Sequence, residues 1–283
     1  MRRFFSMVLP ALFLCNLVIA QDYVPTPADL EKFFKTKTLV VLEDNPLMEY
    51  NLLIQEIMKK EWNVTPFEVI PYSEFESKRK NPDYSFLMLM DVRFEKDKTG
   101  TVYKFLTLLL GGKYIRVNEM PSLVNVPLAY NAVDEFGYIF KLSSLVRFVQ
   151  NHVKLIYEKP DIISNNVFKY YNDNMGDVKS KTLYVVEEEL APEVNSEKRI
   201  KAVYPYKFKI VTKDEVQKAI EDGDDNVVFL HKVGPEGTQL KARCYKILIG
   251  AADAKFYYFD YHMINEKNPD GFLESDFKKL GKK

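Results

Sequence analysis

Short apolar runs alternate along this chain with apolar residues at helical spacing. Residues 39–42 form a wholly apolar run, which is typical of a buried parallel strand. Asn45 and Pro46 then begin a predicted helix, because the apolar residues after them lie three or four positions apart: Leu47, Tyr50, Ile54 and Ile57. Further strands are predicted at 67–70, 84–92, 101–110 and 113–117, with a short helix at 72–79. This order predicts a β-α-β-α-β-β-β module with a mixed sheet.

The same order of patterns occurs again in the second half of the chain. Residues 35–44 resemble residues 179–188, and residues 67–70 resemble residues 208–211. Three further matches share one constant offset: Asp83 with Asp225, Tyr103 with Tyr245, and Lys113 with Lys255. A constant offset over separated segments indicates an internal duplication. We therefore expect an α/β fold with two tandem modules, residues 21–133 and 161–283.

The duplication also predicts which side chains occupy equivalent positions in the two modules. Leu39 should correspond to Leu183, Val69 to Ile210, and Tyr114 to Phe256, each pair pointing into equivalent cores. A slip of one residue would reverse the buried face of a strand, so these pairs are a strict test of the alignment.

A long amphipathic helix is predicted between the modules, within residues 134–160. Its apolar stripe has helical spacing, and Lys159-Pro160 ends it: Leu142, Leu145, Val146, Val149, Val153 and Ile156. We expect this helix to pack on one or both modules, and a partner-binding helix is the alternative. The last residues, 278–283, are rich in lysine and are expected to be a solvated tail.

The amino-terminal residues 1–20 have the pattern of a secretory signal peptide. Arg2 and Arg3 precede an apolar run that ends at Ala20, and polar sequence begins at Gln21. We expect cleavage after Ala20 and export, to a periplasm of the Gram-negative type or out of the cell. The alternative is that the run is kept as a membrane anchor. No later run is long and apolar enough to span a bilayer.

Charge and cysteine content exclude some classes of protein. Removal of residues 1–20 leaves Cys244 as the single cysteine, so no intrachain disulfide can hold the mature chain. The full chain has 40 basic and 40 acidic residues, and loss of Arg2 and Arg3 leaves a net charge of −2. A chain without a basic excess is not expected to bind nucleic acid.

The three histidines do not have the spacing of a common metal site. No HxxxH, HExxH or CxxC arrangement includes His152, His231 or His262. At the offset shared by the three matches, His231 aligns with Leu89 and His262 aligns with Met120. Apolar residues at the matching positions indicate that these histidines are buried and structural. A metal or catalytic role is the alternative.

The common phosphate-binding loops and the GxSxG nucleophile motif are absent from the sequence. Gly111 and Gly112 lie between predicted strands rather than before a helix. Cys244 lies in a predicted strand, where a buried thiol packs as a small apolar group. A nucleophile with His231 or His262 as its base is the alternative. We expect no catalytic residue, no cofactor and no metal.

Acidic residues follow the first predicted strand of each module. Glu43 and Asp44 follow residues 39–42, and Glu187 and Glu188 follow the matching strand. Ligands of open α/β sheets usually bind at the carboxyl ends of strands, so these residues are a candidate site for a cation or for sugar hydroxyl groups. The alternative is that they cap the next helix and keep this edge soluble.

The aromatic run at 256–262 is the second candidate ligand surface. Strict strand alternation would place Tyr257, Phe259 and Tyr261 on one face, and Phe256, Tyr258 and His262 on the other. One face must pack against the core. The other face is a candidate surface for a glycan or a protein.

The order of elements resembles that of known bacterial envelope proteins. A strand, a helix, a strand with an acidic-aromatic helix, and a strand led by Asp83-Tyr84 resemble the amino-terminal domain of TolB and the CsgG-type secretion lipoproteins. The resemblance covers the core of each module, and it implies envelope assembly or protein–protein interaction rather than catalysis.

Three functions follow from this sequence as expectations. The leading one is a non-enzymatic envelope protein that acts through contacts with other envelope proteins. The alternatives are a small-ligand or glycan-binding protein and a hydrolase-type enzyme. A binder should have a concave apolar pocket with a few converging polar groups, for example between the modules.

Overall fold

The computed structural model describes residues 18–19, 23–164, 166–173, 175–236 and 241–282. The expected signal peptide and its cleavage site lie outside these residues, except for the two-residue strand β1 (Val18–Ile19). β1 pairs in parallel with Val92 and Arg93 of the first sheet. Among the helices of the described residues, none is both long enough and apolar enough to cross a membrane.

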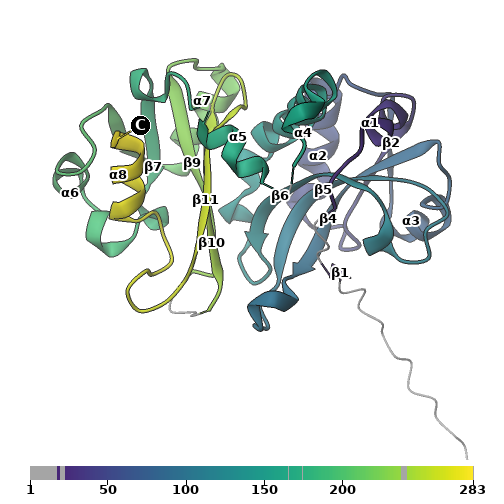
Figure 1. The fold of residues 1–283 in the computed structure, drawn as a ribbon, viewed down its shortest axis with the longest axis horizontal. Helices are drawn as coiled ribbons and strands as arrows, with labels where there is room; N and C mark the ends of the chain where they lie inside the picture. Colours follow the sequence, from purple (N-terminus) through teal and green to yellow (C-terminus); the bar gives the residue numbers. More distant parts are fainter. Residues whose placement is uncertain (1–17, 20–22, 165, 174, 237–240, 283) are drawn as a thin grey trace, which may run out of the picture.

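The first module is a mixed sheet of strand order β3-β2-β4-β5-β6 (Figure 1). β2 is parallel to β3 and β4, and β5 is antiparallel to its two neighbours, β4 and β6. The capping box of Thr26 and Asp29 begins the first helix. The elements are α1 (Pro27–Phe33), β2 (Lys37–Val41), α2 (Glu49–Glu61), β3 (Phe67–Ile70), α3 (Tyr72–Lys78), β4 (Tyr84–Arg93), β5 (Tyr103–Leu110) and β6 (Ser122–Tyr130).

The second module has the same strand order and the same strand directions. Its sheet runs β8-β7-β9-β10-β11, with β7 parallel to β8 and β9, and with β9, β10 and β11 antiparallel. The prediction of two tandem α/β modules is therefore confirmed. The elements are α5 (Val167–Asp173), β7 (Thr182–Val186), α6 (Glu197–Lys201), β8 (Phe208–Val211), α7 (Lys213–Asp222), β9 (Val227–Val233), β10 (Arg243–Gly250), β11 (Phe256–Met263) and α8 (Glu274–Lys282).

The offset shared by the three matches does not relate equivalent residues, because the register changes from strand to strand. The backbone N–H of Lys37 donates to the carbonyl of Asp83, and the equivalent bond runs from Thr182 to Asn226. The bond from Gly111 to Tyr84 likewise corresponds to the bond from Ala251 to Val227. The offset between equivalent residues therefore decreases from β2 to β4 and again from β4 to the end of β5. Loops of different length separate the matching strands.

This register decides the three predicted pairs. The counterpart of Leu39 is Tyr184, not Leu183, so Leu39 and Leu183 point to opposite faces of their sheets. Val69 and Ile210 do correspond, since equivalent bonds join Thr38 to Pro66 and Leu183 to Lys207. The first and third of the pairs are wrong and the second is confirmed.

The pair Tyr114–Phe256 fails because residues 113–117 do not form a strand. The Arg79 guanidinium donates to the carbonyls of Tyr114 and Ile115, at 2.9 and 3.0 Å, and holds them in a loop. The third strand of the meander is instead β6. It contains Pro127, which is tolerated because β6 is the edge strand of its sheet.

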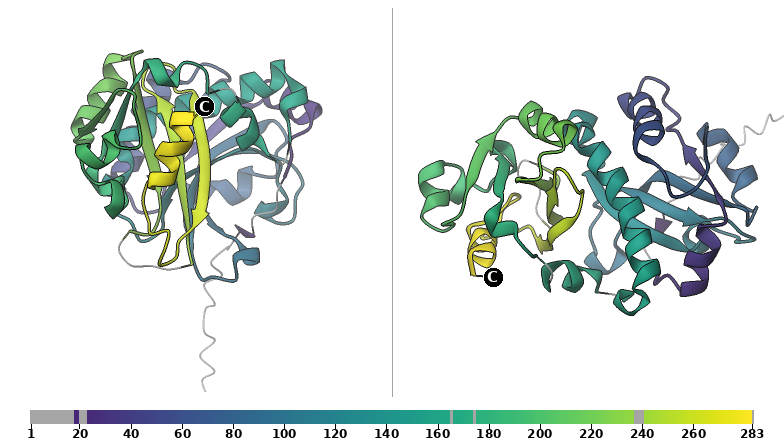
Figure 2. Two further views of the ribbon diagram at one scale, coloured as in Figure 1. Left: turned by 60° about the vertical axis from the view of Figure 1, so that its left-hand side comes forward. Right: turned by 90° about the horizontal axis from the view of Figure 1, so that it is seen from above.

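The predicted connecting helix is α4 (Leu142–Glu158), which runs between the two sheets in Figure 2. All six residues of its predicted apolar stripe are buried. α4 packs against α1 and α2, and the Arg147 guanidinium donates to the carbonyls of Ala251 and Ala252 in the second module. One hydrophobic cluster extends from the first module through α4 to one face of the second sheet, including Phe229, Tyr245 and Phe256.

A second cluster fills the opposite face of the second sheet, under α6 and α8. The expectation of a solvated tail at 278–283 is wrong there, because α8 includes most of these residues and Leu280 is fully buried with Phe277. Lys246 of β10 pairs with the buried Asp276 at 2.7 Å and fixes the start of α8 on the sheet.

Candidate functional site

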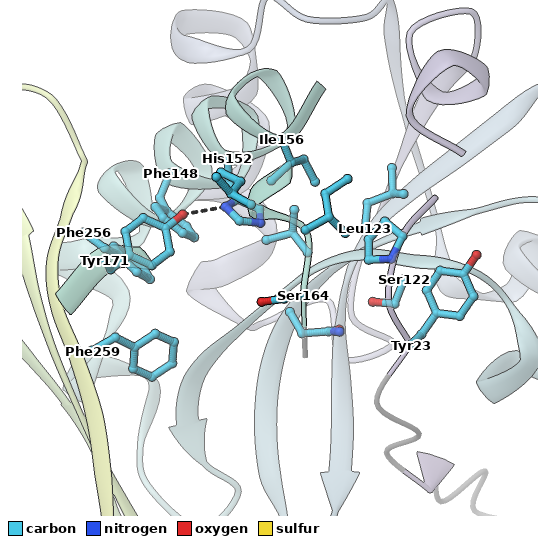
Figure 3. Close-up of a pocket in the computed structure, with 15 residues that line it drawn as sticks. Tyr23, Ser122, Leu123, Phe148, His152, Ile156, Ser164, Tyr171, Phe256 and Phe259 are labelled. Carbon is cyan, nitrogen blue, oxygen red and sulfur yellow. Dashed lines mark hydrogen bonds between the residues drawn. The ribbon is translucent and has the colours of Figure 1, made fainter. Parts of the chain in front are cut away.

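A cavity of about 150 Å³ lies where α4 and α5 meet the β6 edge of the first sheet and β11 of the second (Figure 3). Its wall is mostly apolar, with a few uncharged polar side chains. The lining residues are Tyr23, Pro25, Ser122, Leu123, Val124, Asn125, Phe148, His152, Ile156, Ile162, Ile163, Ser164, Tyr171, Phe256 and Phe259. We call this cavity the intermodule pocket.

Helical spacing on α4 builds one wall of the intermodule pocket. Phe148, His152 and Ile156 follow one another at intervals of four residues, so their side chains lie on one face of the helix. Phe148 stacks on Phe256 of β11, with an interplanar angle of 3°. The second module thereby closes a pocket whose other wall belongs to the first module.

A histidine–tyrosine pair is the polar centre of the pocket. His152 Nδ1 lies 2.5 Å from the Tyr171 hydroxyl, and both side chains are nearly inaccessible to solvent. Burial lowers the pKa of His152 to about 4, since the imidazolium form would lose its hydration. Burial also raises the pKa of Tyr171. Both side chains are therefore uncharged at neutral pH.

The acidic residues at the end of β2 do not cap α2, contrary to one of the expectations. Glu43 lies 3.3 Å from Lys104 Nζ, and Asp44 is exposed. The carboxylate of Glu135 instead accepts the N–H groups of Glu49 and Tyr50, at 2.9 and 3.2 Å. A carboxylate there satisfies free N–H groups and complements the helix dipole.

The equivalent acidic residues of the second module divide between solvent and interior. Glu187 and Glu188 are exposed, whereas the neighbouring Glu189 is buried and forms an ion pair with Lys141, which lies just before α4. This pair joins the connecting segment to the second module. The structure does not bring these acids together with Glu43 and Asp44 in the intermodule pocket.

The aromatic run of β11 does not alternate as expected, because of an irregularity in the ladder. The register with β10 shifts between Leu248 and Ile249, next to Tyr257. Tyr257 therefore packs with Tyr258 in the cluster under α8, while Phe259 faces the cluster shared with the first module. Tyr261 is 38% exposed. Of the three predicted residues, only Phe259 lines the pocket.

Cys244 and His262 are directly opposite one another on β10 and β11. The thiol is nevertheless completely buried, and burial raises its pKa, so the nucleophilic thiolate is disfavoured. His262 Nε2 bonds the carbonyl of Pro269, and His231 Nε2 bonds the carbonyl of Pro127. These contacts are those of structural side chains.

Only a partial signal in the sequence indicates the residues of the intermodule pocket. His152 lies beside the apolar stripe of a predicted helix, and a histidine so placed has to be accommodated near a buried face. Its partner Tyr171 lies in a separate short helix, and no local spacing connects the two. In the part of the chain that the structure covers, no three His, Cys, Asp or Glu side chains are grouped as metal ligands.

No family model, curated protein or solved structure matches this chain significantly. The geometry of the intermodule pocket is therefore the basis for the function proposed next.

Proposed function

We propose that this protein binds a small, largely apolar molecule in the intermodule pocket. The observation that carries the proposal is a concave apolar wall with one buried hydrogen-bonding pair, His152–Tyr171, at the junction of two modules. Small-molecule sites typically combine an apolar lining with a few polar groups that fix orientation, and they occur preferentially at such junctions.

The size of the pocket limits the ligand to a single ring or a short branched chain. Apolar cavities of about 150 Å³ accept molecules of the size of benzene. A ligand of about nine non-hydrogen atoms can reach a dissociation constant of about 0.1–1 mM through burial of its apolar surface. We therefore expect weak, saturable binding of simple one-ring probes.

Acetophenone and α-methylstyrene, titrated into the protein by calorimetry, test the proposal. Both probes should bind, and Ser164→Trp should abolish binding, because a bulky ring at this exposed lining position blocks the pocket. Ser73→Trp, at an exposed position on α3, is the matched control and should bind normally. The proposal fails if neither probe binds saturably, or if Ser164→Trp binds both as the unaltered protein does.

Protein docking is a second candidate function, and a surface at the start of α2 favours it. Leu47 and Phe136 are 89% and 64% exposed, and the bonds of Glu135 to α2 place them at the same end of this helix. The acidic Asp44 and Asp134 are exposed nearby in sequence. Apolar side chains among acidic ones suit a basic amphipathic segment of another envelope protein.

An amphipathic Leu/Lys peptide and its Leu/Glu counterpart distinguish this docking surface from the pocket. The Lys peptide should bind at least about tenfold more tightly, and the double variant Leu47→Ser/Phe136→Ser should weaken its binding, because the variant removes the apolar contacts. Ile115→Ser, at another strongly exposed apolar position, is the control. Equal binding of both peptides, or no effect of the double variant, contradicts docking at this surface.

The proposed site of action is outside the cytoplasm, after removal of residues 1–20. The support for this is the pattern of Arg2, Arg3, the apolar run and Ala20 in the sequence. Intact-mass spectrometry of the exported protein should find a chain that begins at Gln21. A mass that includes residues 1–20 would contradict cleavage.

A further inference from the structure

The position of one proton determines what the polar centre of the pocket can recognise. The Tyr171 hydroxyl is buried, and among the described residues its one hydrogen-bond partner is His152 Nδ1. A buried hydroxyl donates its proton to an available acceptor, so the phenol donates and Nδ1 accepts. In a neutral imidazole, the proton is then on Nε2.

The Nε2–H group of His152 is available to a ligand. In Figure 3 this nitrogen points away from Tyr171, toward the middle of the lining residues. No side chain or carbonyl of the described residues accepts a hydrogen bond from it. Phe148 stacks on the imidazole ring with centroids 5.5 Å apart, which holds the ring in this orientation.

The lining of the pocket also excludes charged ligands. Of the described residues that form its wall, none is Asp, Glu, Lys or Arg. An anion or a cation would lose its hydration there without gaining an opposite charge, and that loss is large in an apolar site.

We propose that the ligand of the intermodule pocket is a neutral one-ring compound with a single hydrogen-bond acceptor, such as a carbonyl or ether oxygen, which accepts from His152 Nε2. Apolar contact with the aromatic wall of Phe148, Phe256 and Phe259 holds the ring, and the oxygen fixes its direction. This inference rests on the function proposed for the pocket, and it adds the chemical class of the ligand.

Acetophenone and α-methylstyrene have nearly the same shape, but only the first has an acceptor. The ratio of their dissociation constants should therefore move about fivefold to tenfold toward α-methylstyrene in His152→Phe, which keeps an aromatic ring and removes the donor. Tyr171→Phe should move the ratio in the same direction by less, because the ring no longer has a fixed proton position. Benzoate and benzylammonium should bind at least tenfold more weakly than acetophenone to the unaltered protein.

The outcomes separate this inference from the function on which it rests. Retention of α-methylstyrene binding by His152→Phe shows that the variant is folded and that its pocket is intact. If the ratio of the two dissociation constants is unchanged in that variant, or if benzoate binds tightly, the inference of a neutral ligand with one acceptor is overturned. The proposal that the pocket binds a small molecule is unaffected by that result. If neither neutral probe binds to the unaltered protein, the proposed function itself fails.

Discussion

Buried polar side chains distinguish the region between the two modules from an ordinary apolar core. His152 pairs with Tyr171, Lys141 pairs with Glu189, and His231 bonds a carbonyl of β6. Each of these groups has left water, so each must either stay neutral or keep its partner. Two consequences can be measured at the level of single residues.

Acid should destabilise the protein through His152. Its pKa is about 6.5 when unfolded and about 4 when folded, so the unfolded chain binds the proton more readily between these values. This contribution to stability is complete above pH 6.5 and is lost as the pH falls toward 4. Urea unfolding measures the free energy of unfolding at pH 7.0 and at pH 4.5. The decrease between these two pH values should be about 2–3 kcal/mol smaller for His152→Phe than for the unaltered protein.

The control for this measurement is His231, whose pKa burial lowers to about 3 and which titrates independently of the pocket. It remains in both proteins, so its effect cancels in the comparison. Equal losses in the two proteins would show that His152 is not the group responsible.

Loss of the Lys141 ammonium should cost far more than loss of an exposed one. Lys141→Met leaves Glu189 buried without its partner, which should lower the free energy of unfolding by about 3–5 kcal/mol. Lys141→Met/Glu189→Leu should recover most of this loss, since no unpaired charge remains. Lys218→Met, in an exposed pair with Asp222, should leave the free energy of unfolding nearly unchanged, because water screens the pair. Equal effects of the two single variants in urea unfolding would contradict the buried pair.

At the scale of elements, continuous apolar patterns in the sequence predict the strands and the helix correctly. They do not predict which residues of the two modules correspond. The runs at β2, β3, β4 and β5 and the stripe of α4 have a single periodicity, so the sequence identifies them. β6 was missed because Pro127 interrupts its pattern, and only its edge position makes the proline acceptable. The three matches that share one offset are not structurally equivalent, because local resemblance does not detect changes in loop length.

The candidate site likewise has features that local sequence patterns predict and contacts between distant residues that they do not predict. The sequence indicates that α4 has a buried face, but the meeting of His152 with Tyr171 and Phe256 depends on how two modules pack. Acidic residues at strand ends were visible in the sequence, whereas the partner of Glu189 lies 48 positions away. Long-range pairing of this kind has no local signal.

The carboxyl-terminal helix α8 should be essential to the second module. Phe277 is fully buried against Phe272 and Tyr204, so Phe277→Ala should lower the free energy of unfolding by about 3–5 kcal/mol. Phe136→Ala removes the same side chain from an exposed position and should cost less than about 0.5 kcal/mol. A solvated tail would instead give equally small effects in a thermal or urea melt.

At the scale of the whole molecule, the two modules share one core and are not independent units. Tyr103 packs against Tyr245 with ring centroids 5.7 Å apart, and Arg243 forms an ion pair with Asp97 at 2.6 Å. The shared cluster extends from the first sheet to one face of the second. The intermodule pocket therefore exists only when both modules are folded and docked.

A shared core predicts that a destabilising substitution in the second module also lowers the stability of the first module. Trp62 is the single tryptophan and is buried in the first module, so its fluorescence reports on that module. Leu230→Ala, in the cluster under α8, should shift the Trp62 transition and the circular dichroism transition by the same amount. If the Trp62 midpoint does not move, or if the two transitions separate, the modules unfold independently and the shared core is refuted.

Nuclear Overhauser effects between bound acetophenone and the protein test the intermodule pocket most directly. The ring protons should give cross-peaks to the methyl groups of Val124 on β6 and Ile156 on α4, and to the ring of Phe256 on β11, since these side chains line one cavity from both modules and from the helix between them. Cross-peaks to all three would place the ligand between the modules. Cross-peaks confined to side chains elsewhere, such as the exposed Ile115, would contradict the account.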